Sequence, residues 1–288
     1  MERHPDPGLK RRLVREFPAL DGADWVKLTG GRTNLVWRIN AAAPMVCKQI
    51  LGPGPSVLFP NDPEAEIAVM RHVAPMGLSP QIDRVLTGDF GTALIYPYQA
   101  GDIADGPRAA TARALARLHT LETDALLTLR SKPGGAARML AEGDAILRRV
   151  SQPGPLTALR PTADVPPSRH RVLLHGDPVP ANAICRGDET LFIDWQCPAI
   201  GDPAEDLAIA LSPAMNWIYA RKTVSPADEA GFLAAYGNAE TTARYTQLKA
   251  CYAYRMAAHC LVRAEAGEQD YFEGYALDLA TLEETRQH

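Results

Sequence analysis

His175-Gly-Asp-Pro-Val-Pro-Ala-Asn182 follows a short apolar run, Val172-Leu-Leu174, whose composition is typical of a buried strand. A second apolar run, Leu191-Phe-Ile193, comes a few residues later and ends directly before Asp194. The first segment contains two prolines and shows no helical periodicity, which predicts a rigid loop after a strand. Polar side chains on such a loop are held in place for a ligand.

Three polar side chains in this region have the types and the order needed for phosphoryl transfer. Asp177 can accept a proton from an attacking hydroxyl, while Asn182 and Asp194 offer oxygen ligands to Mg²⁺, a hard cation. The same order, a loop Asp, an Asn five residues later and a downstream metal-binding Asp, occurs in kinases. A single loop Asp is usually only a turn former. His175 is a second candidate base, but we expect it to order the loop while Asp177 acts as the base.

Lys48 lies within an apolar, strand-like run, Met45-Val-Cys-Lys-Gln-Ile50, in a chain with only six lysines. It either faces solvent from an alternating strand or places a cation on the α- and β-phosphates of a nucleotide. In the second case a glutamate from the next helix steadies the lysine. Of the two glutamates that open this helix, Glu66 is preferred, because Met70 and Val73 share its face.

Gly30, Gly31, Thr33 and Asn34 lie in the turn between the first two predicted strands. Glycines and small polar residues allow backbone N–H groups to approach phosphates. The same composition is also typical of an ordinary hairpin turn. The segment lacks the Gly-x-Gly-x-x-Gly pattern, so alone it does not separate a phosphate-binding turn from a plain one.

Predicted strands cluster in the first third of the chain, and predicted helices fill most of the rest. Strands are expected within 24–50 and 92–96, and between them a helix begins near Asn61 and ends at Gly77. Further helices are expected at about 108–122, 134–150, 203–212, 226–236, 240–265 and after 269. The proline-rich stretch 153–169 is predicted to be a surface loop. This order predicts an α+β fold with a small antiparallel-sheet lobe, residues 1–97, and a helical lobe, residues 98–288.

Composition excludes several classes of protein. The 288 residues carry a net charge of −4, which argues against general affinity for nucleic acid or anionic membranes. The N-terminal residues lack the apolar core of a signal peptide, and no apolar run is long enough to span a membrane. Five scattered cysteines are expected to be reduced thiols. These features together lead us to expect a cytoplasmic protein.

The motifs together resemble those of the aminoglycoside phosphotransferase and choline kinase family, whose members have a bilobal protein-kinase-like fold. The similar residues span positions 30 to 208 and are Gly30-Gly31-x-Thr33-Asn34, Lys48, Glu66, Ala114–His119, His175-Gly-Asp177 with Asn182, Ile193-Asp194-Trp195 and Gly201–Ala208. The last two motifs together are quite specific.

The resemblance implies roles for further residues and exposes two departures. It implies that Tyr96 and Tyr98 belong to the hinge that meets adenine, and that Asp206 supports the catalytic loop. Within that loop, residues 178–181 are Pro-Val-Pro-Ala, where the family often has Leu-His-Pro-Gly. Gln196 stands where an acidic residue is common. These departures argue against transferring a particular substrate from the family.

The expected activity is transfer of a phosphoryl group from ATP, with Mg²⁺, to a hydroxyl of a small metabolite. The acceptor is either an amino alcohol such as choline or a sugar of the aminoglycoside type. Five aromatic residues in the helical region either line its pocket or fill the core: Trp217, Tyr219, Tyr236, Tyr252 and Tyr254. Asp102 and Glu205 either face a cationic acceptor or are solvated. Two alternatives are a non-catalytic nucleotide-binding protein and a metal-dependent phosphohydrolase using His175, Asp177 and Asp194.

Overall fold

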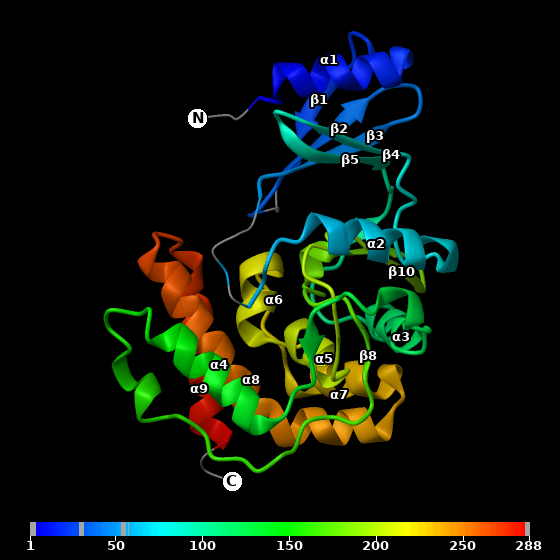
Figure 1. Ribbon diagram of the computed structural model, residues 1–288. Coiled ribbons are helices and arrows are strands. Elements are labelled where there is room, and N and C mark those ends of the chain that lie inside the picture. Colours follow the sequence, from blue (N-terminus) through cyan, green and yellow to red (C-terminus); the bar gives the residue numbers. More distant parts are fainter. Residues whose placement is uncertain (1–3, 29–31, 53–55, 57, 286–288) are drawn as a thin grey trace. The chain divides into compact units, whose positions relative to one another are not determined.

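The computed structural model describes residues 4–28, 32–52, 56 and 58–285 (Figure 1). By their internal contacts, residues 1–101 and 191–197 form one compact unit, and residues 102–190 and 198–288 form a second. The segment that carries Asp194 thus belongs with the N-terminal residues. The division after residue 97 that the sequence predicts remains a prediction.

The first unit is built on a five-stranded sheet with the strand order β1-β2-β3-β5-β4. The strands are β1 (Asp24–Lys27), β2 (Leu35–Asn40), β3 (Met45–Ile50), β4 (Arg84–Gly88) and β5 (Gly91–Pro97). All the pairings are antiparallel, and Lys48 on the central strand β3 pairs with Val36 on one side and Leu94 on the other. Every residue of β3 is buried, so a charged side chain there requires a partner.

Two helices of the first unit contribute to opposite faces of this sheet. From α1 (Pro7–Glu16), Leu9 and Leu13 pack with Trp37, Cys47 and other apolar residues of one face. Because strand side chains alternate, Lys48 points to the other face, where α2 (Pro63–Val73) supplies Glu66.

Helix α2 begins where the sequence predicts and ends at Val73, four residues before the predicted end at Gly77. Asp62 caps its first turn by accepting a hydrogen bond from the N–H of Ala65 at 3.0 Å, with Pro63 in the first helical position. A short 3-10 turn, Ala74–Met76, follows, and Gly77 ends it in the left-handed region at φ 72°. The cap fixes where the helix begins, and therefore which of its side chains face the sheet.

The second unit consists mainly of helices: α3 (Ala109–Leu118), α4 (Ala136–Leu147), α5 (Ala204–Ala210), α6 (Pro213–Ala220), α7 (Pro226–Tyr236), α8 (Ala239–Glu265) and α9 (Asp270–Thr285). The long helix α8 packs against both α4 and α9, while α6 packs against α9 and α3 against α7. Each of the predicted helical regions contains one of these helices, and α6 is an additional helix that the pattern does not predict.

Two small sheets hold the loop that contains Asp177. One has the order β7-β11-β8, with β7 (Ser131–Lys132), β11 (Ala199–Gly201) and β8 (Val172–Leu174). The other has the order β10-β9-β6, with β10 (Glu189–Phe192), β9 (Ala183–Arg186) and β6 (Asp102–Ile103). The loop leaves β8, passes through a 3-10 turn at Pro180–Asn182 and enters β9. Strand β10 ends at Phe192, so Ile193 lies outside the strand.

The observed elements confirm the predicted α+β class. The described part of the chain contains no helix long and apolar enough to cross a membrane. The five cysteines are all free thiols and all buried.

Candidate active site

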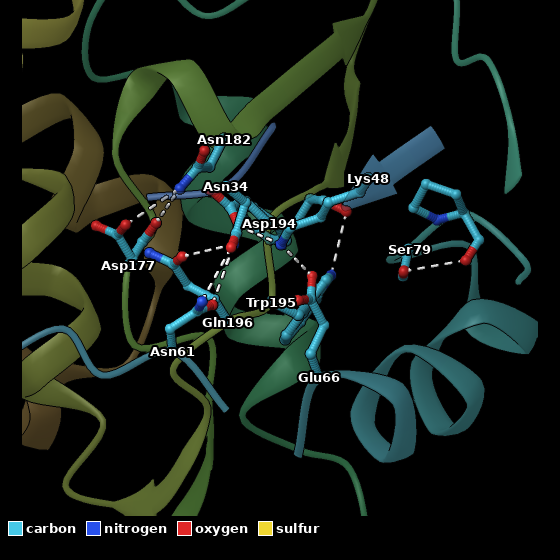
Figure 2. A network of polar contacts seen from close by, with 12 residues as sticks. Asn34, Lys48, Asn61, Glu66, Ser79, Asp177, Asn182, Asp194, Trp195 and Gln196 are labelled. Atoms are coloured by element: carbon cyan, nitrogen blue, oxygen red, sulfur yellow. Dashed lines mark hydrogen bonds and ion pairs between the residues drawn. The ribbon is translucent and has the colours of Figure 1, made fainter. Parts of the chain in front are cut away.

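Lys48 lies between two carboxylates in the first unit. Its Nζ is 2.5 Å from Oε1 of Glu66 and 2.5 Å from Oδ1 of Asp194 (Figure 2). The side chains of Lys48 and Glu66 are 2% and 1% exposed, and that of Asp194 is 24% exposed. Burial opposes the charge of Lys48, but the carboxylates of Asp194 and Glu66 outweigh it and raise the pKa of the ammonium group. Lys48 therefore remains a fixed cation.

The sequence predicts correctly which glutamate lies beside Lys48. Glu66 is buried on α2 together with Val69, Met70 and Val73, whereas Glu64 on the same helix is exposed. The helical repeat brings residues 66, 70 and 73 onto one face.

Asp194 sits in an irregular segment directly after β10. Its φ of 61° is in the left-handed region, which is uncommon for a residue other than glycine. The next residue, Trp195, is fully buried, and its Nε1 donates to the carbonyl of Phe192 at 3.2 Å. The rings of Phe192 and Trp195 also meet edge to face at 6.2 Å. This anchoring sustains the unfavourable backbone conformation of Asp194.

The predicted phosphate-binding turn is described only in part. Gly30 and Gly31 lie outside the described residues, and Thr33 is half-buried. The Asn34 side chain is buried, and its Nδ2 donates to Oδ1 of Asn61 at 3.0 Å and to Oε1 of Gln196 at 3.3 Å. Because the Asn34 side chain is bonded within the protein, it is not available to a nucleotide.

Tyr96 and Tyr98 lie at the end of β5 and just beyond it. Tyr96 is buried, and burial raises the pKa of its hydroxyl. The N–H of Tyr98 donates to the carbonyl of Pro44 at 2.9 Å, and the Arg38 guanidinium lies 4.3 Å from the Tyr98 ring centroid. The main-chain N–H of Tyr98 is thus occupied within the protein.

The loop after β8 holds Asp177 and Asn182 together in the second unit. The Nδ2 of Asn182 donates to the main-chain carbonyl of Asp177 at 2.9 Å and lies 3.4 Å from its Oδ2 (Figure 2). His175 is fully buried, and its Nδ1 accepts from the N–H of Asp177 at 3.2 Å. These contacts are those of a histidine that orders the loop.

Asp206 on α5 holds the beginning of this loop. Its two carboxylate oxygens accept from the N–H groups of His175 at 2.8 Å and Gly176 at 2.9 Å. The Nε2 of His119 is 3.2 Å from the same carboxylate, and the Nδ1 of His119 is 2.8 Å from the Tyr236 hydroxyl. Asp206 therefore supports the loop as the resemblance implies, and His119 is a satisfied buried residue. No feature of the sequence predicts the contact between Tyr236 and His119.

Two other acidic residues, Asp202 just before α5 and Glu205 within it, form ion pairs inside the protein. Asp202 accepts from the N–H of Ala204 at 3.1 Å and pairs with Arg244 at 2.5 Å. Glu205 is buried, and pairs with Arg255 at 2.6 Å and Lys132 at 2.9 Å. These cations lower the pKa of Glu205 to about 2 against the opposing effect of burial. Glu205 is therefore neither solvated nor available to a cationic acceptor.

Three solved structures resemble the chain in fold. Choline kinase LicA from Streptococcus pneumoniae superposes with a TM-score of 0.65 at 15% identity, covering 96% of this chain and 99% of that one. A choline/ethanolamine kinase family protein from Mesorhizobium loti gives 0.64 at 17% identity, with 96% and 93% covered. The GDP and kanamycin complex of APH(2")-IIia gives 0.63 at 15% identity, with 98% and 99% covered. These likenesses confirm the protein-kinase-like fold.

Sequence comparison identifies the family. No curated protein matches the chain. The model of the phosphotransferase enzyme family matches residues 24–249, which is more than half of the chain and includes Lys48, Asp177 and Asp194. This match confirms the predicted class of small-molecule phosphotransferase, and the chain belongs to the phosphotransferase enzyme family.

Proposed function

We propose that the protein transfers the γ-phosphoryl group of ATP, in the presence of Mg²⁺, to a hydroxyl group of a small metabolite. The observation that carries this proposal is the buried Lys48 held between Glu66 and Asp194 at 2.5 Å from each. In protein kinases a strand lysine, a helix glutamate and a metal-binding aspartate form this set, and the lysine contacts the α- and β-phosphates.

At the nucleotide end, the proposal assigns the polyphosphate to Lys48 and to the main chain of the turn that contains Gly30, Gly31 and Thr33. Tyr96 and Tyr98 are assigned to the region that meets the base. The similar APH(2")-IIia structure is a GDP complex, which supports a nucleoside phosphate as the donor. A guanine nucleotide therefore has to be tested beside ATP.

Asn182 and Asp194 are the residues proposed to hold Mg²⁺, and their chemistry fits that ion. Both offer oxygen atoms, and because Nδ2 of Asn182 bonds to Asp177, its Oδ1 is the end left for a cation. Within the described ranges, no three His, Cys, Asp or Glu side chains form a metal-binding group. Mg²⁺ at kinase sites characteristically uses one or two protein carboxylates plus substrate phosphates. When bound, the ion would neutralise charge that develops on the phosphate oxygens.

Asp177 is the proposed general base. Its carboxylate takes the proton of the acceptor hydroxyl as the hydroxyl oxygen forms a bond to the γ-phosphorus. The bond between that phosphorus and the β–γ bridging oxygen breaks, and ADP leaves with the electron pair. His175 and Asn182 keep Asp177 in place through its main-chain N–H and carbonyl groups.

For the acceptor we propose a hydroxyl compound from the amino alcohol or amino sugar class. Of the five aromatic candidates, Tyr236, Tyr252 and Tyr254 are buried, and the Tyr254 hydroxyl donates to Asp144 at 2.8 Å. They belong to the core, which leaves Trp217 and Tyr219, both half-buried on α6, as candidates for contact with a substrate.

A coupled assay of ADP release tests the proposal. Choline, ethanolamine, thiamine, homoserine, methylthioribose and several aminoglycosides are offered as acceptors with Mg·ATP and Mg·GTP. Nucleoside diphosphate release that requires one acceptor supports a kinase, whereas release that is equally fast without an acceptor indicates a hydrolase. Nucleotide binding without any turnover indicates a non-catalytic protein. Undiminished turnover by Asp177→Ala would overturn the proposed role of that residue.

A further inference from the structure

Three amide side chains from distant parts of the sequence meet inside the first unit (Figure 2). They belong to Asn34, Asn61 and Gln196, which are 6%, 5% and 4% exposed. We call this group the amide cluster. Buried amides are costly unless their donors and acceptors are all paired, so the arrangement of their hydrogen bonds is informative.

Asn34 is at the centre of the amide cluster, and its side chain uses its full bonding capacity. Its Nδ2 donates to Asn61 at 3.0 Å and to Gln196 at 3.3 Å. Its Oδ1 accepts from Nδ2 of Asn61 at 2.9 Å and from the N–H of Leu51 at 3.3 Å. An amide has two donors and two lone pairs, so rotation of Asn34 would break all four contacts. The cluster therefore has one favoured arrangement.

Gln196 connects the amide cluster to the ion pairs of Lys48. Its main-chain carbonyl accepts from the N–H of Asp62, the residue that caps α2, at 2.9 Å. Glu66 lies on that helix, and Asp194 precedes Gln196 by two residues. Both carboxylates bond to Lys48. The helix start and the segment 194–196 are thus joined at two points, once through Gln196 and once through Lys48.

The position of Asp194 needs such support, because its backbone lies in the left-handed region at φ 61°. We infer that the amide cluster positions Asp194 in the nucleotide site, an inference that rests on the proposed function. The cluster fixes the segment that contains Asp194 relative to α2 and to Asn34. Gln196 performs this role as a neutral hydrogen-bond acceptor, where the family commonly has an acidic residue.

Near-isosteric apolar substitutions test the inference. Gln196→Met removes an acceptor of the Asn34 amide. Asn61→Leu removes both the acceptor and the donor that bond to Asn34, and the donor to the carbonyl of Gly52. Gln49→Met is the matched control, because Gln49 is also a buried amide of the first unit but bonds to the carbonyl of Phe90 at 2.9 Å. Affinity for Mg·ATP and Mg·GTP is measured by calorimetry, and stability by thermal unfolding.

We expect Gln196→Met, which loses one buried hydrogen bond, to weaken nucleotide affinity about tenfold. Asn61→Leu loses three such bonds and should weaken affinity at least as much. The double variant should lose little more than either single variant, because the residues act as one unit. Gln49→Met should lower the unfolding temperature and leave affinity within about twofold. If Gln196→Met does not fold, Gln196→Asn withdraws the acceptor by one methylene and should weaken affinity in the same direction.

Two results would overturn the inference, and only the second would also overturn the proposed function. Wild-type affinity in folded Gln196→Met and Asn61→Leu, with only their stability lowered, assigns the cluster a purely structural role and leaves the proposed function intact. Failure of the wild-type protein to bind either nucleotide removes the proposed function and the inference with it.

Discussion

The Nζ of Lys48 and the Oε1 of Glu66 lie 2.5 Å apart, and both side chains are almost completely removed from solvent. A buried ion pair contributes little net stability over an apolar pair, but breaking it from one side leaves an uncompensated charge. Lys48 has a second partner in Asp194, so the loss of Glu66 would leave the cation charged but free to move. The pair therefore serves to place a cation more than to stabilise the fold.

Glu66→Gln should lower both stability and activity. We expect a loss of about 3 kcal/mol in the free energy of unfolding, at the lower end for breaking a buried pair because Asp194 remains. Turnover should fall at least tenfold if the lysine no longer meets the phosphates correctly, an effect of about 1.4 kcal/mol on the barrier. Urea unfolding and steady-state kinetics measure the two quantities.

Glu64→Gln is the control for this substitution, because Glu64 is an exposed acid on the same helix. It should change stability by less than about 0.5 kcal/mol and leave turnover unchanged. Equal effects of the two substitutions would show that α2 responds to its net charge and not to the contact with Lys48.

Asp177→Ala should separate nucleotide binding from chemistry. Loss of a general base reduces turnover by roughly 10²- to 10⁴-fold, while the nucleotide affinity measured by calorimetry should change by less than about threefold. Asp188→Asn provides a control, because Asp188 is exposed and pairs only at the surface with Arg113. A parallel loss of affinity and turnover in Asp177→Ala would assign Asp177 to nucleotide binding.

The elements that the sequence predicts are those with a strong periodic pattern or clear end signals. Helix α2 has both, and β3 is apolar apart from Lys48 and Gln49. The missed elements bury few residues: α1 begins with the start signal Asp6-Pro7 but buries only Leu9 and Leu13, and β4 buries one residue, Leu86. Helix α6 begins at Pro213, directly after the short break at Leu211–Ser212, and lies beyond the helix predicted at 203–212.

The candidate site likewise contains residues that the sequence predicts and residues that it does not. Lys48 and Glu66 are predictable because each stands out within a single element, a cation in an apolar strand and an acid on an apolar helix face. The amide cluster is not predictable, since its members are separated by up to 162 positions and each is an ordinary polar residue in its local sequence. Gln196 is noticeable only as a departure from the family pattern, and the structure supplies its partners.

Asp206→Asn should loosen the loop that carries Asp177. The carboxylate accepts two main-chain N–H groups and contacts His119, and an amide replaces one of its acceptors with a donor. We expect a loss of about 3 kcal/mol in unfolding free energy, because bonds to a charged acceptor are lost inside the protein. Tyr236→Phe removes only the far end of this chain of contacts and should cost about 1 kcal/mol. A larger loss in Tyr236→Phe than in Asp206→Asn, measured by urea unfolding, would contradict this order.

His259→Gln should make the protein less sensitive to acid. Burial in α8, assisted by the charge of Arg263, lowers the pKa of His259 to about 3, whereas an unfolded histidine has a pKa of about 6.5. Between these values only the unfolded chain binds the proton, so the stability of the wild-type protein falls as the pH falls from 6.5 toward 3. From pH 7 to pH 5 this linkage lowers the wild-type unfolding free energy by about 2 kcal/mol more than that of His259→Gln. Urea unfolding at both pH values measures the difference, with the exposed His170→Gln as control, and an identical pH dependence of wild type and His259→Gln would show that His259 takes up a proton in the folded protein.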